Sequence, residues 1–332
     1  MRAIVMRAFG APDVLQAEEV VAPVAGPGQV LVAVAVAGIT SVETQVRAGR
    51  APHPSMAPAL PAIPGNGVGG VVVATGEGAD PALVGRRVVA STGGTGGYAE
   101  RVAAGAAGLI EVPAALSLAQ AVALLADGRT ALALLRGAAP RPGEAVLVEA
   151  AGGGVGSLLV QLARDAGARV VATAGGRRKL DLARELGAAV AVDYTAPDWP
   201  ERVRAALGGG GVDVAFDGVG GEIGRAAAGL VRAGGRFCPF GMASGRFAGV
   251  SEAEAAGRGV TLVPGARPSP AQSVALSRAA LEAAAAGRLR PTIGQTFPLE
   301  QAAAAHAAIE SRATLGKTLL LTGDPGAAPG AG

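Results

Sequence analysis

A glycine-rich turn in the middle of the chain, set between a predicted strand and a predicted helix, restricts the fold more than any other feature. The turn Ala151–Gly156 follows the apolar strand Val146–Ala150 and opens the predicted helix Val155–Gly167. A strand that turns this tightly into a helix leaves no room for side chains, and the helix N-terminus offers N–H groups and the positive end of its dipole to a phosphate. In this setting the turn predicts a phosphate site, with an ordinary glycine-rich turn as the alternative. The candidate contacts are Ala151, Gly153, Gly154, Val155 and Gly156.

Strands and helices alternate after this turn. Parallel neighbouring strands need crossover helices, so the alternation predicts a doubly wound parallel sheet, that is, an α/β fold. The predicted helices are Val155–Gly167 and Arg178–Leu186. The predicted strands are Arg169–Ala174, Ala189–Asp193, Val212–Asp217, Arg236–Phe240 and Val260–Val263.

The first third of the chain has a different pattern, with short apolar or alternating runs separated by Gly and Pro. This spacing is typical of a small twisted sheet or barrel. The predicted strands there are Ala3–Met6, Gln29–Ala37, Val68–Thr75, Arg87–Ala90 and Tyr98–Val102, and a helix is predicted at Ser117–Leu135. Near the end we expect a helix at Leu299–Ser311, a strand at Lys317–Thr322 and a disordered tail at 323–332, which contains only Gly, Ala, Pro and one Asp.

Charge and cysteine content exclude several classes of protein. The net charge is +3, and Arg177–Lys179 is the only tight cationic triplet, so a main role in nucleic-acid binding is not expected. The single cysteine, Cys238, cannot form a disulfide within the chain, which is typical of a reducing compartment. We expect neither a membrane span nor a signal peptide, and a cytoplasmic location.

The segment after the second strand of the parallel sheet indicates which dinucleotide is bound. Strand Arg169–Ala174 leads into Gly175, Gly176, Arg177, Arg178 and Lys179, without the acidic residue that would bind an unmodified ribose. Three cations favour a 2′-phosphate and therefore NADPH, although a helix start that merely carries charge is the alternative. The cofactor candidates here are Gly175, Arg177 and Lys179. Residues at other strand ends are further candidates, namely Tyr194, Gly218, Phe240 and Gly241.

Motifs along nearly the whole chain resemble the quinone oxidoreductase branch of the medium-chain dehydrogenase/reductase superfamily. They are Phe9–Leu15, Pro64–Gly65, Gly70–Val72, Gly96–Glu100, Thr130–Ala131, the glycine turn and Glu310–Lys317. The resemblance implies a GroES-like β-rich catalytic domain at 1–120 and 295–322, and a Rossmann NADPH-binding domain at 121–294. It also implies hydride transfer from NADPH to a quinone or an α,β-unsaturated carbonyl compound, and a homodimer.

The same resemblance implies roles for individual residues. Lys179, Tyr194 and Arg312 stand where the family holds the 2′-phosphate region, and Thr130 where it contacts the nicotinamide end. Lys317, at the end of the last motif, is also a candidate cofactor residue. Zinc-binding relatives need a set of Cys and His ligands. Because this chain has one Cys and two His, we expect no metal.

Three positions depart from the family pattern. Thr40 and Gln45 replace an Asn and a Tyr, and Gly67 replaces a Glu. We take Thr40 and Gln45 as the candidate catalytic residues, which would act as polar contacts to a small apolar substrate. The departures leave three interpretations open: a reductase with altered substrate preference, a non-redox cyclase, isomerase or lyase, and an NADPH-binding protein without turnover.

Overall fold

The computed structural model describes residues 1–265 and 268–323, which form two compact units. The terminal unit contains Met1–Arg129 and the chain from Ser269 onward, and the central unit is Thr130–Pro268. Residues 121–129 and 269–294, which were predicted to belong to the nucleotide domain, group with the terminal unit. The tail at 324–332, which was expected to be disordered, lies outside the described residues.

The terminal unit is built on a seven-stranded sheet in the order β14-β15-β3-β4-β5-β7, with β6 also paired to β3. The pair β1–β2 is antiparallel. The strands are β1 (Arg2–Met6), β2 (Leu15–Glu19), β3 (Gln29–Ile39), β4 (Gly67–Thr75), β5 (Arg87–Ser91), β6 (Arg101–Gly105), β7 (Ile110–Glu111), β14 (Ile293–Pro298) and β15 (Lys317–Leu321). The helices are α1 (Ser41–Arg47), α2 (Leu118–Leu125), α9 (Pro270–Ala285) and α10 (Ala302–Glu310).

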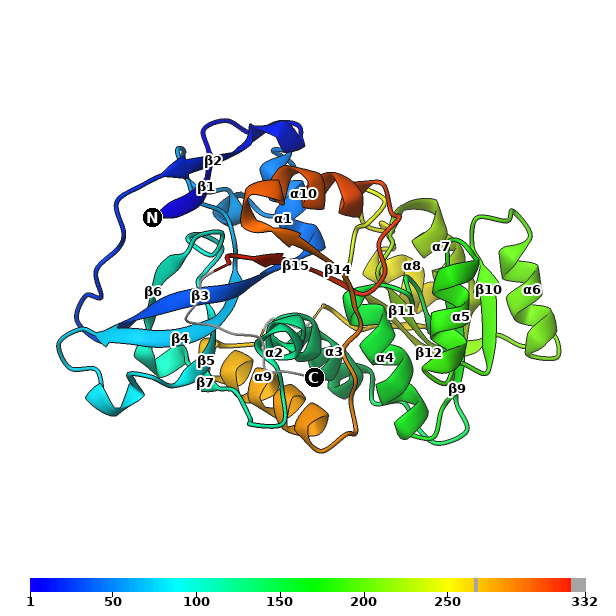
Figure 1. The fold of residues 1–332 in the computed structure, drawn as a ribbon. Helices are drawn as coiled ribbons and strands as arrows, with labels where there is room; N and C mark the ends of the chain where they lie inside the picture. Colours follow the sequence, from blue (N-terminus) through cyan, green and yellow to red (C-terminus); the bar gives the residue numbers. More distant parts are fainter. Residues whose placement is uncertain (266–267, 324–332) are drawn as a thin grey trace. The chain divides into compact units, whose positions relative to one another are not determined.

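The long strand β3 explains how this sheet forms around one core. Alternate residues from Val30 to Val36 are buried, so one face of the strand is apolar. This face joins a core that includes Ile4, Tyr98 and Leu320. The C-terminal strand β15 pairs antiparallel with β3 and parallel with β14, so the end of the chain completes the sheet begun at the start. Helices α2 and α9 lie side by side in this unit (Figure 1).

The central unit contains a parallel six-stranded sheet in the order β10-β9-β8-β11-β12-β13. Its strands are β8 (Ala145–Val148), β9 (Arg169–Ala174), β10 (Val190–Asp193), β11 (Val212–Asp217), β12 (Val231–Pro239) and β13 (Thr261–Leu262). The chain steps outward from β8 to β10 and then in the opposite direction from β11 to β13. The order therefore reverses between β8 and β11, where ligands bind at the carboxyl ends of strands in open α/β sheets. The predicted fold class is confirmed.

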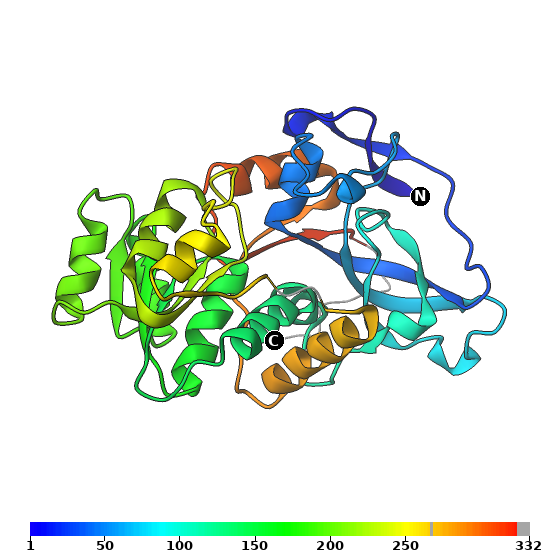
Figure 2. The same ribbon diagram turned by 180° about the vertical axis from the view of Figure 1, so that it is seen from behind.

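Helices cover both faces of the central sheet (Figures 1 and 2). They are α3 (Asp127–Ala138), α4 (Gly154–Asp165), α5 (Arg177–Glu185), α6 (Trp199–Ala206), α7 (Gly221–Leu230) and α8 (Glu252–Gly257). Helices α4 and α5 pack together against β8, β9 and β10, whereas α6 packs with α7, which contacts β11 and β12. Right-handed crossovers in opposite directions produce this two-sided arrangement.

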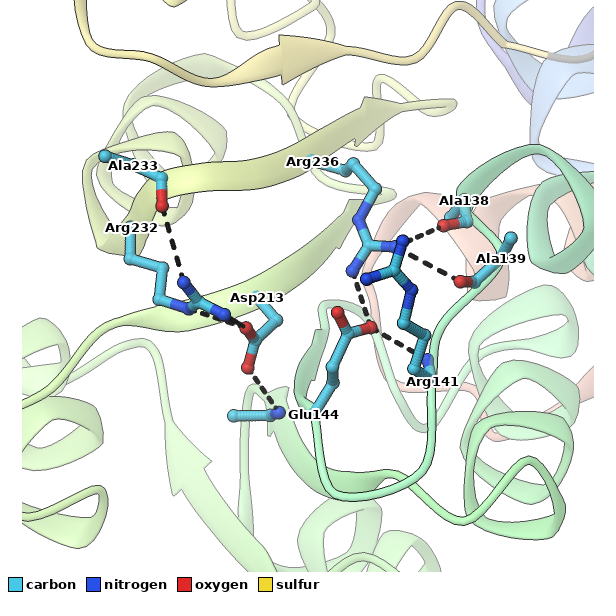
Figure 3. A network of polar contacts seen from close by, with 9 residues as sticks. Ala138, Ala139, Arg141, Glu144, Asp213, Arg232, Ala233 and Arg236 are labelled. Atoms are coloured by element: carbon cyan, nitrogen blue, oxygen red, sulfur yellow. Dashed lines mark hydrogen bonds and ion pairs between the residues drawn. The ribbon is translucent and has the colours of Figure 1, made fainter.

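A network of polar contacts around Arg236 lies near the start of β8, at the end of that strand opposite to its carboxyl end (Figure 3). Arg236 on β12 donates to the carbonyl oxygens of Ala138 and Ala139 at 3.0 and 3.1 Å, and it pairs with Glu144 at 2.5 Å. Glu144 also accepts a hydrogen bond from the backbone N–H of Arg141 at 2.8 Å. Burial alone would raise the pKa of Glu144, but these donors hold it below its ordinary value. The network therefore joins the end of α3, the start of β8 and β12.

Several predicted elements differ from those observed. The single helix predicted at Ser117–Leu135 is two helices, because α2 ends at Leu125 and α3 begins at Asp127, whose carboxylate pairs with Lys317. The strand predicted at Tyr98–Val102 begins only at Arg101. The helix predicted at Leu299–Ser311 starts with a 3-10 turn at Leu299–Gln301.

No single described helix is long and apolar enough to span a membrane, although α2 and α3 together would meet the requirement of length and composition as a bent pair.

Candidate functional site

The glycine turn has the tight geometry that the sequence predicted. Ala150 has a positive φ of 50°, and its carbonyl accepts a hydrogen bond from Gly153 N at 2.8 Å. A Cβ added at Gly156 would lie 2.2 Å from that same carbonyl oxygen, so only glycine fits there. Helix α4 then begins at Gly154, and its N-cap Gly153 supplies no side-chain hydrogen bond. The first N–H groups of α4 therefore have no side-chain cap and match what a phosphate requires.

The start of α5 lies beside this turn. A Cβ added at Gly152 would come within 2.6 Å of Lys179 Cβ, so the turn and the first residues of α5 are in close contact. Gly175 lies between the end of β9 and α5, and a Cβ there would be 3.4 Å from the ring of Tyr194. Arg177 has 93% of its side chain exposed. The structure thus brings Lys179, Tyr194 and Gly175 to the same edge of the sheet as the glycine turn.

Two further turns pack against each other at the carboxyl ends of β11 and β12. The backbone N–H groups of Phe240 and Gly241 donate to the Asp217 carbonyl oxygen at 2.9 and 3.1 Å. A Cβ at Gly218 would lie 2.8 Å from the Phe240 ring, and one at Gly241 would lie 2.5 Å from the Gly218 carbonyl oxygen. Such close approach of the two backbone segments is possible only because positions 218 and 241 carry no side chain.

The remaining cofactor candidates lie elsewhere in the chain. Thr130 is in the first turn of α3, at the start of the central unit. Arg312 and Lys317 belong to the terminal unit. Arg312 follows α10 with a positive φ of 58°, and Lys317 is the first residue of β15. The cofactor roles of these three residues remain predictions.

Thr40 and Gln45, the two catalytic candidates, lie at opposite ends of the short helix α1. Thr40 is the N-cap, and both its backbone N–H and its hydroxyl donate to Glu43 Oε2 at 2.6 Å. Gln45 Oε1 accepts a hydrogen bond from Arg50 Nε at 3.1 Å. Both side chains are only partly buried. In this arrangement the Thr40 hydroxyl hydrogen is held by Glu43, so this hydroxyl offers its lone pairs to a ligand.

Glu43 is a buried carboxylate that was not among the site residues predicted from the sequence. Its other oxygen accepts from the backbone N–H of Asn66 at 3.0 Å. Burial raises the pKa of Glu43, while the Thr40 hydrogen bonds, the charge of Lys317 and the Asn66 N–H act in the opposite direction. The neighbouring Gly67 has limited space, since an added Cβ would lie 3.3 Å from Leu125 Cδ2. The sequence did contain a signal for Glu43, because a Thr followed three residues later by a Glu is the pattern of a helix capping box.

Lys317 forms a buried ion pair in the same unit. Its Nζ lies 2.9 Å from Asp127 Oδ1, and the two side chains are 4% and 10% exposed. A Cβ added at Gly38 would lie 3.3 Å from Lys317 Cε, which shows how closely the backbone of β3 packs on the lysine stem. The pair joins the start of β15 to the start of α3.

A second buried cluster centres on His306 of α10. Tyr98 Oη lies 3.1 Å from His306 Nε2, and the two rings meet edge to face with centroids 5.8 Å apart. Burial, assisted by the charge of Arg47, lowers the pKa of His306 to about 3, so the imidazole is neutral. Burial and the neighbouring Glu43 raise the pKa of Tyr98 well above its ordinary value.

Across residues 1–265 and 268–323, no three His, Cys, Asp or Glu side chains come together in a way that could hold a metal ion. Cys238 is buried in β12, and burial raises the pKa of its thiol to about 12. His53 caps the 3-10 turn Pro54–Met56, with Nδ1 accepting from Ser55 N at 3.2 Å.

Comparisons with known proteins agree with the two-unit architecture. The family profile described as "Alcohol dehydrogenase GroES-like domain" matches residues 26–114, and the one described as "Zinc-binding dehydrogenase" matches residues 154–276. A 2-haloacrylate reductase from Burkholderia sp is 34% identical, covering 96% of this chain and 98% of its own. The quinone oxidoreductase of Rattus norvegicus is 33% identical, with 97% and 98% covered. The crystal structure of Escherichia coli quinone oxidoreductase complexed with NADPH superimposes with a TM-score of 0.88 at 30% identity, covering 97% of this chain and all (100%) of that one.

Proposed function

This chain belongs to the quinone oxidoreductase branch of the medium-chain dehydrogenase/reductase family, and on that premise we propose that it reduces a quinone or an α,β-unsaturated carbonyl compound with NADPH. The protein is an NADPH-dependent oxidoreductase. The observation that carries the proposal is the convergence of the glycine turn, Lys179, Tyr194 and the Gly218 and Gly241 turns at the carboxyl edge of the central sheet.

The residues of the central unit bind and orient the dinucleotide. The nicotinamide of bound NADPH supplies a hydride equivalent for the reduction. The N-terminus of α4 would hold the pyrophosphate, because its first N–H groups have no side-chain cap and point their dipole outward. Lys179 and Tyr194 would hold the 2′-phosphate region, and Gly218, Phe240 and Gly241 the nicotinamide end. Orientation accounts for most of what a hydride transfer requires from a protein.

Polar groups of the terminal unit would contact the substrate. Thr40 offers lone pairs while Glu43 holds its hydroxyl hydrogen, and Gln45 carries an amide group that can donate. Such a donor stabilises charge on a developing enolate, whereas a quinone can take its protons from water. Neither residue is a practical acid, so we propose a small apolar quinone or enone as substrate.

We propose that the reaction proceeds without zinc. The whole chain has one cysteine and two histidines, too few soft ligands for the tetrahedral site of a zinc dehydrogenase. We further propose a cytoplasmic homodimer that has no main role in nucleic-acid binding and does not bind a membrane. The small net charge of +3, scattered along the chain, supports the first of these exclusions.

The decisive experiment follows the loss of NADPH absorbance when a panel of quinones and enones is added, with NADH as the control cofactor. We expect turnover that prefers NADPH. The departures at Thr40, Gln45 and Gly67 favour one competing proposal, a non-redox reaction such as cyclisation, isomerisation or lyase chemistry. Tight NADPH binding without oxidation across the whole panel would exclude the reductase and favour the competing proposal.

The cofactor preference provides a separate prediction about Lys179. Replacing Lys179 with methionine removes a charge while keeping most of the stem, so NADPH affinity should fall by roughly 10–100-fold, as expected for a lost charge-assisted contact to phosphate. NADH affinity should change little. Arg184→Met is the matched control, because Arg184 lies in the last turn of the same helix and pairs with Asp181 at 2.8 Å. Equal losses for both cofactors would contradict the assigned role.

A further inference from the structure

Two buried carboxyl groups lie side by side where the strand order of the central sheet reverses. Glu149 follows β8 and Asp217 ends β11, and both are 0% exposed. The strands are paired in parallel with Val148 opposite Phe216, and Glu149 N donates to the Phe216 carbonyl oxygen at 3.0 Å. The next residues along each strand are Glu149 and Asp217, so their side chains project to the same face of the sheet.

Asp217 shapes the turns that flank the switch point. Its Oδ1 accepts hydrogen bonds from the backbone N–H groups of Val219 and Gly220 at 2.9 and 2.6 Å. Its Oδ2 lies so close to α7 that a Cβ added at Gly224 would be 2.4 Å away. One oxygen therefore organises the turn Gly218–Gly221, and the other is confined beneath the helix that follows.

The confined oxygens lack ordinary hydrogen-bond donors. Within the described residues, Asp217 Oδ2 and both carboxyl oxygens of Glu149 have no assigned hydrogen-bond partner. Two ionised carboxylates at this depth would repel each other strongly in a low-dielectric interior. A single proton held by Glu149 removes the repulsion and creates a donor for Asp217 Oδ2.

We propose that Glu149 is a positioning residue, which keeps a proton at neutral pH, donates it in a hydrogen bond to Asp217 Oδ2 and so holds the Gly218–Gly221 turn in the form that accepts NADPH. This inference rests on the proposed function for the identity of the ligand. Glu149 also precedes Ala150, whose positive φ starts the glycine turn, so the pair touches both backbone segments that would receive the cofactor.

The surroundings of Glu149 determine the sign of the pH effect. Burial raises the pKa of Glu149 most, the neighbouring Asp217 carboxyl group raises it further, and only the nearby Val219 N–H acts in the opposite direction. On the neighbouring strand β9 the matching residue is the uncharged Thr173. The charged residues of α7, Glu222 and Arg225, are exposed and engaged in their own ion pairs, with Arg246 and Glu254.

Because the folded-state pKa of Glu149 is raised, its contribution to stability is fully present below the unfolded pKa, near about 4.3, and is lost as pH rises through the folded value. Loss of the proton to solvent would leave two adjacent carboxylates and loosen the turn. NADPH binding should therefore weaken once the pH exceeds the folded pKa, by up to about tenfold per pH unit.

The test measures NADPH affinity of the whole protein by fluorescence titration from about pH 6 to pH 10, without any substrate. Wild type should bind more weakly as the pH rises. Glu149→Gln keeps a permanent donor to Asp217, so its affinity should match wild type at neutral pH and should not share the high-pH loss. Glu149→Leu has no donor and should bind more weakly at every pH. Equal pH profiles for wild type and Glu149→Gln, or full affinity in Glu149→Leu, would overturn the proposal.

Thermal unfolding of the same variants separates this inference from the proposed function. If wild type binds no NADPH at any pH, the proposed function fails, and the carboxyl pair is still testable. Glu149→Gln should then unfold at a higher temperature than wild type, with a gap that widens as the pH rises. If the difference in unfolding temperature between Glu149→Gln and wild type stays constant with pH, the proposal that Glu149 holds a proton shared with Asp217 is wrong.

Discussion

Lys317→Met should lower the free energy of unfolding by about 3–5 kcal/mol, since it leaves the Asp127 carboxylate buried without its partner. The ammonium group and the carboxylate are 2.9 Å apart and almost inaccessible to solvent. Methionine fills most of the lysine stem's volume, so the loss arises from the uncompensated charge and not from a large cavity. Urea unfolding followed by circular dichroism would measure the change.

Two further variants isolate the buried charge as the cause. Arg86→Met breaks an ion pair with Glu111 whose side chains are 57% and 60% exposed, and it should cost less than about 1 kcal/mol. The double variant Lys317→Met with Asp127→Asn removes both charges and should recover part of the lost stability. A double variant as unstable as the sum of its two single changes would contradict this account.

Gly156→Ala should weaken NADPH binding by at least about 100-fold, through displacement of α4 from the turn that precedes it. The added Cβ would lie 2.2 Å from the Ala150 carbonyl oxygen, and a backbone atom cannot swing aside as a flexible side chain can. The helix must shift, and its N–H groups then no longer face the phosphate position. Fluorescence titration with NADPH would detect the loss.

Gly229→Ala is the matched control for the glycine variant. Gly229 lies in α7 of the same unit, is exposed, and has open space where a Cβ would be placed. Alanine should stabilise that helix by roughly 0.5–1 kcal/mol and leave NADPH affinity unchanged. If Gly156→Ala binds NADPH as well as Gly229→Ala does, the glycine turn does not receive the cofactor.

The strands of the central unit and its helices α4 and α5 were predictable because their signals are local, whereas α6, α7 and α8 were not predicted. Strands β9 and β11 have the predicted bounds. Each is a short apolar run, and β9 ends before the turn at Gly175 whereas β11 ends at Asp217. The conformation of the glycine turn likewise follows from neighbouring residues, and the structure places Lys179 close to Gly152. In both cases a few adjacent side chains decide the conformation.

The terminal unit was harder to predict because its contacts join distant parts of the chain. Strand β14 and helix α9 were missed. Strand β14 is fixed by pairing with β15, and α9 is fixed by packing against α2, more than 140 residues earlier in the chain. The polar partner of Lys317 was missed for the same reason, whereas the partner of Thr40 is Glu43, only three residues away in a capping box, and was a local signal that was overlooked. Asp127 and Lys317 are 190 residues apart in sequence, a separation that no local pattern reveals.

The position of β15 between β14 and β3 has a consequence for synthesis on the ribosome. The central unit is one continuous segment, Thr130–Pro268, and can fold as soon as it has emerged. The terminal unit is completed later, because Val36–Ile39 of β3 lack their strand partner on one side until Lys317–Leu321 leaves the exit tunnel. During that interval the open part of the β3 edge can pair with another chain, and a ribosome that stalls before Lys317 is made leaves a complete central unit and an incomplete terminal sheet.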